Sequence, residues 1–280
     1  MNLRKLILTK NAVYKAGRTI KPKGIMVHST GAYNPSLNRY VGPDDGLLGV
    51  NRDRKGNVID NHWNRDRPDG RFVCVHAFIG LLGDEETIAT YQTLPWNYRG
   101  SHCGHGPKGS GNETHISFEI CEDNLAGAAY FAAVYKEAVE LCAHLCGIFN
   151  FNPAADGAII GHFEGHKRGI ASNHSDPHNW FPRHGKSMDT FRRDVAAALA
   201  AAKETEGDMV TQAQFEAMFD EMMRGRAAKP PAEWAEEPWA KAKKKPSAHE
   251  PGRMVMDGTN PQGYITRQEH AATLYRLGLL

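Results

Sequence analysis

Two histidines and a glutamate stand where predicted strands end or present a polar face. His28 follows the apolar run Ile25–Val27, His162 follows another short apolar run, and Glu119 lies within an alternating stretch. A catalytic zinc ion takes three protein ligands and leaves a fourth position for water or substrate. Two imidazoles and one carboxylate would form such a set. Because the chain has 14 histidines, chance clustering stays open as the alternative to a metal site.

Glu119 is placed by the alternation of residues 115–122, which predicts a half-buried strand. Ile116, Phe118 and Ile120 share one face of this strand. Glu119 therefore points away from an apolar layer. From the residues alone, it is equally well a carboxylate on an exposed sheet face or a catalytic group.

The segment His162-Phe-Glu-Gly-His166 has the spacing H-x-E-x-H. The helical zinc motif of metalloproteases is H-E-x-x-H, which places both histidines on one helix face. The segment therefore does not predict that protease geometry.

Short strands alternate with longer helices over the first part of the chain, which predicts an α/β domain. Apolar residues at steps of three and four predict the helices. The predicted strands are 25–27, 72–79, 115–122 and 158–160, and the predicted helices are 124–149 and 188–199.

The composition changes after this domain, and Pro230-Pro231 interrupts the remainder. We expect a catalytic domain over 1–205, a helical linker over 206–232 and a small, mainly helical module over 233–280.

The composition is that of an ordinary globular protein, with 41% hydrophobic and 24% charged residues and a net charge of +2. The one dense basic run, Lys241–Lys245, is read as a solvated linker, so no nucleic-acid partner is expected. No run approaches the length of a membrane span, so no membrane insertion is expected. The apolar run Leu6–Leu8 is too short for a secretory segment, and we expect synthesis in the cytoplasm without a signal peptide. The five cysteines form no CxxC pair and are expected to stay reduced.

Six short motifs occur along residues 20–185. They are, in order, Ile-Met-Val-His28-Ser-Thr, Val-His76-Ala-Phe-Ile-Gly, Tyr-Arg-Gly-Ser-His102-Cys-Gly, Ile-Ser-Phe-Glu119-Ile-Cys-Glu-Asp, Ile-Ile-Gly-His162 and Ser-Asp176-Pro-His178. In these motifs and their order the chain resembles the type 2 N-acetylmuramoyl-L-alanine amidases. This family shares its fold with peptidoglycan-recognition proteins and includes phage endolysins and bacterial autolysins. The resemblance implies a mixed central β-sheet flanked by helices.

The resemblance also implies roles for particular residues. His28, His162 and Asp176 match the positions that hold Zn²⁺, and Glu119 matches the glutamate assigned as general base in the catalytic endolysin branch. Many members carry a lysine two residues before the third ligand to stabilise the oxyanion, whereas this chain has His174. Either His174 or zinc itself is expected to take that role.

Three further residues are expected to contact substrate. His102 matches a histidine of the substrate groove, and His76 either orients a ligand or packs in the core. Trp96 is expected in the groove because sugar rings stack on aromatic faces, with core packing as the alternative.

The activity implied by the resemblance is hydrolysis of peptidoglycan between the lactyl group of muramic acid and the first L-alanine of the stem peptide. We expect the enzyme to act at the bacterial cell wall, after it leaves the cytoplasm through holin-type pores. Two alternatives stay open, a cytosolic amidase that recycles soluble anhydro-muropeptides and a non-catalytic peptidoglycan-binding module.

The C-terminal module is similar to a repeat of the S-layer-homology type. The similarity lies in Trp234–Trp239, Asp257–Pro261 and Ile265–Arg276. It implies attachment to the cell wall, with self-association or a linker role as the alternative.

Overall fold

The computed structural model describes residues 1–53, 55–208, 212–256 and 267–279. The chain divides into two compact units, Met1–Glu204 and Thr205–Leu280. The finer division of the C-terminal part into a linker over 206–232 and a module over 233–280 stays a prediction.

The first unit is built on one mixed β-sheet, which within the described residues has six strands in the order β1-β4-β3-β5-β2-β6. β3 and β4 pair antiparallel, and the other neighbouring strands pair parallel. The expected α/β fold with a mixed central sheet flanked by helices is therefore confirmed. The strands are β1 (Leu3–Lys5), β2 (Gly24–Ser29), β3 (Ala77–Leu81), β4 (Ile88–Gln92), β5 (His115–Ile120) and β6 (Ile159–Gly161).

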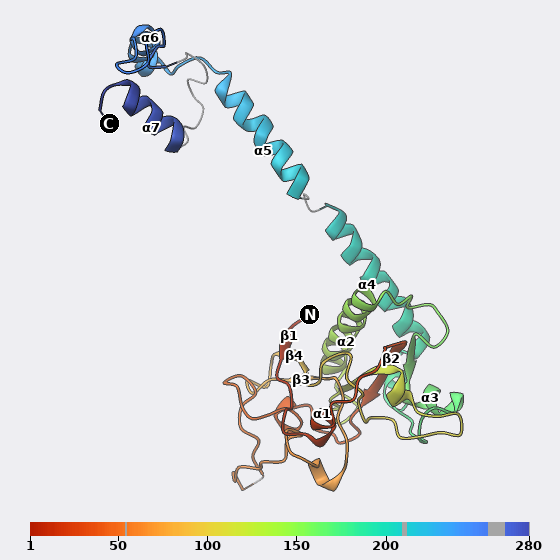
Figure 1. Cartoon of the computed structure of the whole chain (residues 1–280). Helices are drawn as coiled ribbons and strands as arrows, with labels where there is room; N and C mark the ends of the chain where they lie inside the picture. Colours follow the sequence, from red (N-terminus) through yellow and green to blue (C-terminus); the bar gives the residue numbers. More distant parts are fainter. Residues whose placement is uncertain (54, 209–211, 257–266, 280) are drawn as a thin grey trace. The chain divides into compact units, whose positions relative to one another are not determined.

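Helices cover the sheet of the first unit, and the described part of the second unit is also helical. The long helix α2 lies alongside the strands, as Figure 1 shows. The α-helices are α1 (Ala12–Lys15), α2 (Ala128–Phe149), α3 (His162–Arg168), α4 (Met188–Asp208), α5 (Gln212–Ala227), α6 (Glu236–Lys244) and α7 (Arg267–Arg276). Short 3-10 turns occur at η1 (Leu37–Arg39), η2 (Pro68–Gly70), η3 (Gly111–Glu113), η4 (Phe181–His184) and η5 (Glu233–Ala235).

The main core lies between one sheet face and helices α2 and α4. Val27, Phe118 and Leu141 are fully buried in it. A second cluster, which includes Phe78 and Tyr91, covers the opposite face with loops and α1. Because both faces are covered, strand ends rather than strand middles are where polar side chains can gather.

Helix α2 begins at Ala128, later than the sequence pattern indicates. The Asp123 carboxylate accepts hydrogen bonds from the N–H groups of Leu125 and Gly127, at 2.7 and 3.1 Å. This Asx-type turn competes with helix for the same backbone donors. The helix ends at Phe149, and the next residue, Asn150, adopts the left-handed conformation common at helix C-termini.

The expected strand 72–79 is shifted, since β3 starts only at Ala77. Upstream of it, Cys74 pairs in an isolated bridge with Ser101 instead of a sheet neighbour. The three-residue strand β1 and the strand β4 carry no alternation strong enough for sequence reasoning to find.

In the second unit, Arg276 of α7 forms an ion pair with Glu250, with an N–O distance of 2.6 Å. Parts of the S-layer-like pattern, Asp257–Pro261 and residues 265–266, lie outside the described residues. None of the described helices is both long and apolar enough to cross a membrane.

Phe118 offers a test of the main core. Replacing Phe118, which is fully buried between the sheet and α2, with alanine should lower the free energy of unfolding by about 3–5 kcal/mol, because it removes apolar burial and leaves a cavity. Ile148 is 52% exposed on the same helix layer, so Ile148→Ala should change the free energy by about 0.5 kcal/mol or less. Urea denaturation followed by circular dichroism measures both. Equal effects would contradict this packing.

Candidate metal centre

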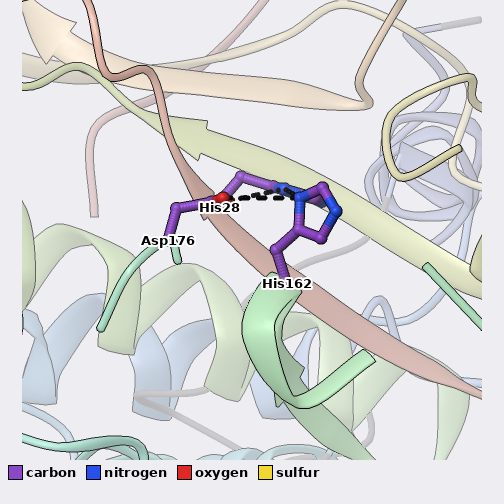
Figure 2. Close-up of side chains that lie close together, drawn as sticks. All are labelled: His28, His162 and Asp176. Atoms are coloured by element: carbon purple, nitrogen blue, oxygen red, sulfur yellow. Dashed lines mark hydrogen bonds and ion pairs between the residues drawn. The ribbon is translucent and has the colours of Figure 1, made fainter. Parts of the chain in front are cut away.

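Three side chains from distant parts of the chain converge at one end of the sheet. His28 lies on β2, His162 begins α3, and Asp176 lies on the loop that follows α3. Their ligand atoms all lie within 4.8 Å of one another. Figure 2 shows the three side chains pointing toward a common centre.

Strand pairing explains how two of these residues meet. β2 pairs in parallel with β5 and with β6, so the carboxyl ends of all three strands lie at one edge of the sheet. In open α/β sheets this edge is where ligands bind. Along β2, Ile25 and Val27 face the main core, whereas Met26 faces the other side with His28. His162 follows β6 directly, and this places it beside the end of β2.

Helix α3 is held by an ion pair behind the site. The Nη1 and Nη2 atoms of Arg192 both donate to the Glu164 carboxylate, at 3.0 and 3.1 Å. Glu164 also accepts a hydrogen bond from the N–H of Gly161 at 2.9 Å. In the segment His162–His166, the glutamate therefore anchors the helix, and His166 bonds the carbonyl of Ala171 instead of joining the centre.

The donor set fits a small divalent cation. The Nδ1 atom of His28 lies 3.0 Å from Oδ2 of Asp176 and 3.1 Å from Nδ1 of His162. The Nδ1 atom of His162 lies 3.4 Å from Oδ1 of Asp176. Tetrahedral zinc with bonds of about 2.0–2.1 Å separates its ligands by about 3.3 Å. Two ring nitrogens facing each other at 3.1 Å also need a shared proton or a cation between them. The observed separations therefore suit zinc.

The remaining ring nitrogens have their own partners. Nε2 of His28 lies 2.9 Å from Nδ1 of His102, and Nε2 of His162 lies 3.3 Å from the Ser172 hydroxyl. Such contacts set the tautomer and orientation of a metal-binding histidine. His102 therefore lies behind His28 while it also lines the cleft described below.

The local electrostatics favour the protonation states that a metal requires. Burial lowers the pKa of His28, and the hydrogen bond with Asp176 only partly opposes this shift. Burial raises the pKa of Asp176, but hydrogen bonds from His162 and His28 outweigh it, so this pKa lies below its ordinary value. A neutral imidazole and an ionised carboxylate at neutral pH are the forms that bind metal.

Glu119 lies beside this group, because it is paired in register with His28 on the neighbouring strand. Its Oε2 atom is buried and, among the described residues, has no hydrogen-bond partner. Burial raises the pKa of Glu119 well above the ordinary value, and the charges of Asp176 and Glu122 add to the shift, which Arg71 opposes. A carboxylate with a raised pKa can accept a proton and hold it.

A cleft of about 470 Å³ opens over the centre. Glu119, His102 and the exposed His174 line it together with the three grouped residues. The ring of His174 stacks on that of His162, with 4.6 Å between centroids. The other walls include Thr30 and Ser101, which lie within the motifs, and five residues that the sequence did not single out: Arg39, Tyr40, Arg71, Phe72 and Val73.

Two expected substrate contacts lie elsewhere. His76 is fully buried, with Nδ1 at 3.0 Å from the N–H of Ser117 and Nε2 at 2.8 Å from the carbonyl of Tyr98. Trp96 packs against the main core and stacks near His76, with 6.4 Å between centroids. Neither is among the residues that line the cleft, whereas Trp63 is. This geometry favours packing over substrate contact for both residues, and their substrate role stays a prediction.

Sequence comparison places the chain in a family. The family model described as N-acetylmuramoyl-L-alanine amidase (Amidase_2) matches residues 18–179. The chain belongs to this amidase family. The matched range contains β2, β5, β6 and the loop with Asp176, so it includes the whole centre. A comparison with curated proteins finds no match.

Several solved structures are similar to the chain. The Staphylococcus aureus hydrolase AmiA in complex with its ligand is 18% identical, with 73% of this chain and 86% of that chain covered and a TM-score of 0.49. The PlyG catalytic domain is 20% identical, with 71% and 96% covered and a TM-score of 0.46. A mutant endolysin from Bacillus subtilis is 24% identical, with 70% and 99% covered and a TM-score of 0.43.

His76 makes the stability of this amidase-family fold depend on pH. Burial lowers the pKa of His76 to about 4, although hydrogen bonds with Tyr98 and Ser117 oppose the shift. In the unfolded chain a histidine titrates near about 6.5. Between these values only the unfolded state is protonated at this residue, so stability falls as the pH falls. For His76→Asn, the loss of unfolding free energy between pH 7 and pH 4 should be about 2–3 kcal/mol smaller than for the wild type. Urea titrations at several pH values measure this difference, and equal losses would contradict it.

Proposed function

We propose that this protein is a zinc-dependent amidase that hydrolyses the bond between N-acetylmuramic acid and L-alanine in bacterial peptidoglycan. The supporting observation is the buried group of His28, His162 and Asp176 beside Glu119, at the base of a cleft, in a chain of the amidase family. In this proposal these three residues hold the zinc ion. Figure 2 shows how they face one another.

A bound zinc ion would supply Lewis acidity, which polarises a carbonyl and lowers the pKa of water to about 7. Glu119 acts as the proton carrier in this proposal. Its unpartnered Oε2 takes a proton from the attacking water and then passes it to the departing alanine nitrogen. The raised pKa supports this role, since the carboxyl must hold the proton between the two steps.

His174 is proposed to stabilise the negative charge that develops on the scissile carbonyl oxygen. It lines the cleft and stacks on His162, so its ring lies beside the metal-binding group. A donor aimed at developing charge lowers the barrier without reorganising during the reaction. His174 stands at the position where many family members carry the lysine that stabilises the oxyanion, so the proposed role is the same.

The substrate is proposed to be the muramyl peptide of the cell wall, where the enzyme would act. We also propose that the C-terminal module attaches the enzyme to the wall. Only the similarity of its sequence to an S-layer-homology-type repeat supports this second role.

The first test concerns Glu119. Glu119→Ala should lower the rate of release of free L-alanine amino termini from peptidoglycan by about 10²–10⁴-fold, because the proton carrier is lost. Its zinc content, measured by atomic emission, should stay that of the wild type. Glu86→Ala, at an exposed glutamate, is the matched control and should keep full activity. Wild-type turnover by Glu119→Ala, or full activity after removal of zinc by a chelator, would refute this mechanism.

Asp176→Ala separates an enzyme from a binding module. An amidase should lose zinc and activity together in this variant, because one of three ligands is gone. A protein that keeps its metal content and its affinity for peptidoglycan after this change would instead be a non-catalytic binder.

The third test concerns His174. His174→Ala should lower kcat by about 10²–10³-fold with zinc content unchanged, because an oxyanion donor is lost. His178→Ala is the control, since His178 is an exposed histidine of the same loop that packs against Phe163. Steady-state kinetics on purified muropeptides measure both variants. If both lose the same amount of activity, the assignment of His174 is wrong.

A further inference from the structure

Glu122 is a buried carboxylate next to the candidate metal centre. It follows the end of β5 and is only 1% exposed. Its Oε1 atom accepts hydrogen bonds from the Ser29 hydroxyl and from Nδ2 of Asn179, the latter at 3.2 Å. Its own N–H donates to the Thr30 hydroxyl at 3.1 Å. A single residue thus contacts two separate segments of the chain.

Burial of the Glu122 carboxylate costs free energy of hydration, which its contacts only partly offset. Both donors to the Glu122 side chain are neutral groups, and within the described part of the chain Oε2 has no hydrogen-bond partner. A carboxylate that is buried without a positive partner loses hydration that neutral donors replace only in part. Stabilisation of the fold therefore does not explain why a carboxylate is buried at position 122.

The two partners lie on the segments that carry the proposed metal ligands. Ser29 directly follows His28 at the end of β2, and Asn179 lies three residues after Asp176. One carboxylate oxygen thereby joins the end of a strand to the ligand loop. The separation of His28 from Asp176 depends on how these two segments are held.

The loop with Asp176 has other anchors, which restrain its two sides differently. The N–H of Phe163 donates to the carbonyl of Asp176 at 3.2 Å, and the N–H of Trp180 donates to the carbonyl of Pro177 at 3.1 Å. Trp180 is itself fully buried in the main core. These contacts tie the loop to α3 and to the core, whereas the bond from Asn179 to Glu122 ties it toward β2 and β5.

We propose that Glu122 is a positioning residue that holds the His28 and Asp176 segments at the separation a metal ion requires. It acts through Ser29 and Asn179 and touches neither metal nor substrate. This inference rests on the proposed function, because it takes His28, His162 and Asp176 as the metal ligands.

Glu137 provides a matched control. It is also a buried glutamate, 7% exposed, and its Oε1 accepts two hydrogen bonds, from the N–H of Asn2 and the Thr90 hydroxyl, both at 2.8 Å. Unlike Glu122, it also has a positive partner, because its Oε2 lies 4.0 Å from the N-terminal ammonium group. It lies on α2 and joins the N-terminus to β4, away from the metal group. Loss of Glu137 therefore reports what loss of a buried, hydrogen-bonded carboxylate does to the fold alone.

The experiment measures the zinc dissociation constant of the full chain by competition with a chromophoric chelator at pH 7. Glu122→Ala should raise this constant by about 10–100-fold, the usual effect of losing a partner that orients metal ligands. The zinc dissociation constant of Glu137→Ala should stay within about threefold of the wild-type value. This should hold even if thermal melting of the metal-free proteins shows that Glu137→Ala and Glu122→Ala are equally destabilised. Glu122→Gln keeps an acceptor oxygen for Ser29 and Asn179, so it should lie closer to the wild type than Glu122→Ala.

Several outcomes would overturn the proposal. One is an equal zinc dissociation constant for Glu122→Ala and Glu137→Ala. Another is a Glu122→Gln variant that binds zinc as weakly as Glu122→Ala. If Glu122→Ala does not fold, Asn179→Ala removes one link only, and wild-type zinc affinity in that variant would also overturn it. A wild-type chain that binds no zinc would refute the metal site of the proposed function itself, which distinguishes that failure from failure of the role of Glu122.

Discussion

The parallel pairing of β2 with β5 and β6 is the constraint from which the geometry of the centre follows. In this register His28 pairs with Glu119, and the end of β6 delivers His162 to the same edge. A shift of β2 by one residue would turn His28 into the main core and Val27 toward the cleft, because side chains alternate along a strand. The apolar face that β2 and β5 share against α2 makes such a shift unfavourable. Packing of the core therefore sets the positions of the reactive groups.

Burial then sets the charge states of those groups. The same shielding lowers the pKa of His28 and raises that of Glu119. Asp176 moves in the opposite direction to Glu119, because it accepts hydrogen bonds from both histidines. The pKa values of these two carboxyl groups are therefore shifted in opposite directions, and in our proposal Asp176 is the anionic ligand and Glu119 the proton carrier. Such a separation of pKa values is a common property of hydrolytic sites.

Polar contacts between side chains of different elements surround the centre. Arg192 fixes α3 through Glu164, and His102 bonds the outer nitrogen of His28. In our proposal Glu122 completes this arrangement by joining the strand end to the loop of Asp176. In that proposal the supporting residues hold the three metal ligands in place.

The sequence by itself determined the elements that have strong local patterns. Alternation in 115–122 placed Glu119 opposite the apolar face of β5, and the spacing of apolar residues indicated α2 to within a few residues. Ordered motifs also indicated the family, which the family model then showed. Short strands such as β1 and β4 escaped, since three to five residues carry too little periodicity to distinguish them from loops.

The family resemblance grouped His28, His162 and Asp176, but only the tertiary structure decided how closely such distant side chains approach. His28 and Asp176 are 148 residues apart, and no local pattern records that they lie 3.0 Å from each other. Long-range packing likewise set the burial of His76, the position of Trp96 beside the core and the positions of the arginines that line the cleft. Local sequence encodes periodicity and turns. The distance between residues on different strands depends on sheet order and register, which arise only when the whole domain buries its apolar faces together.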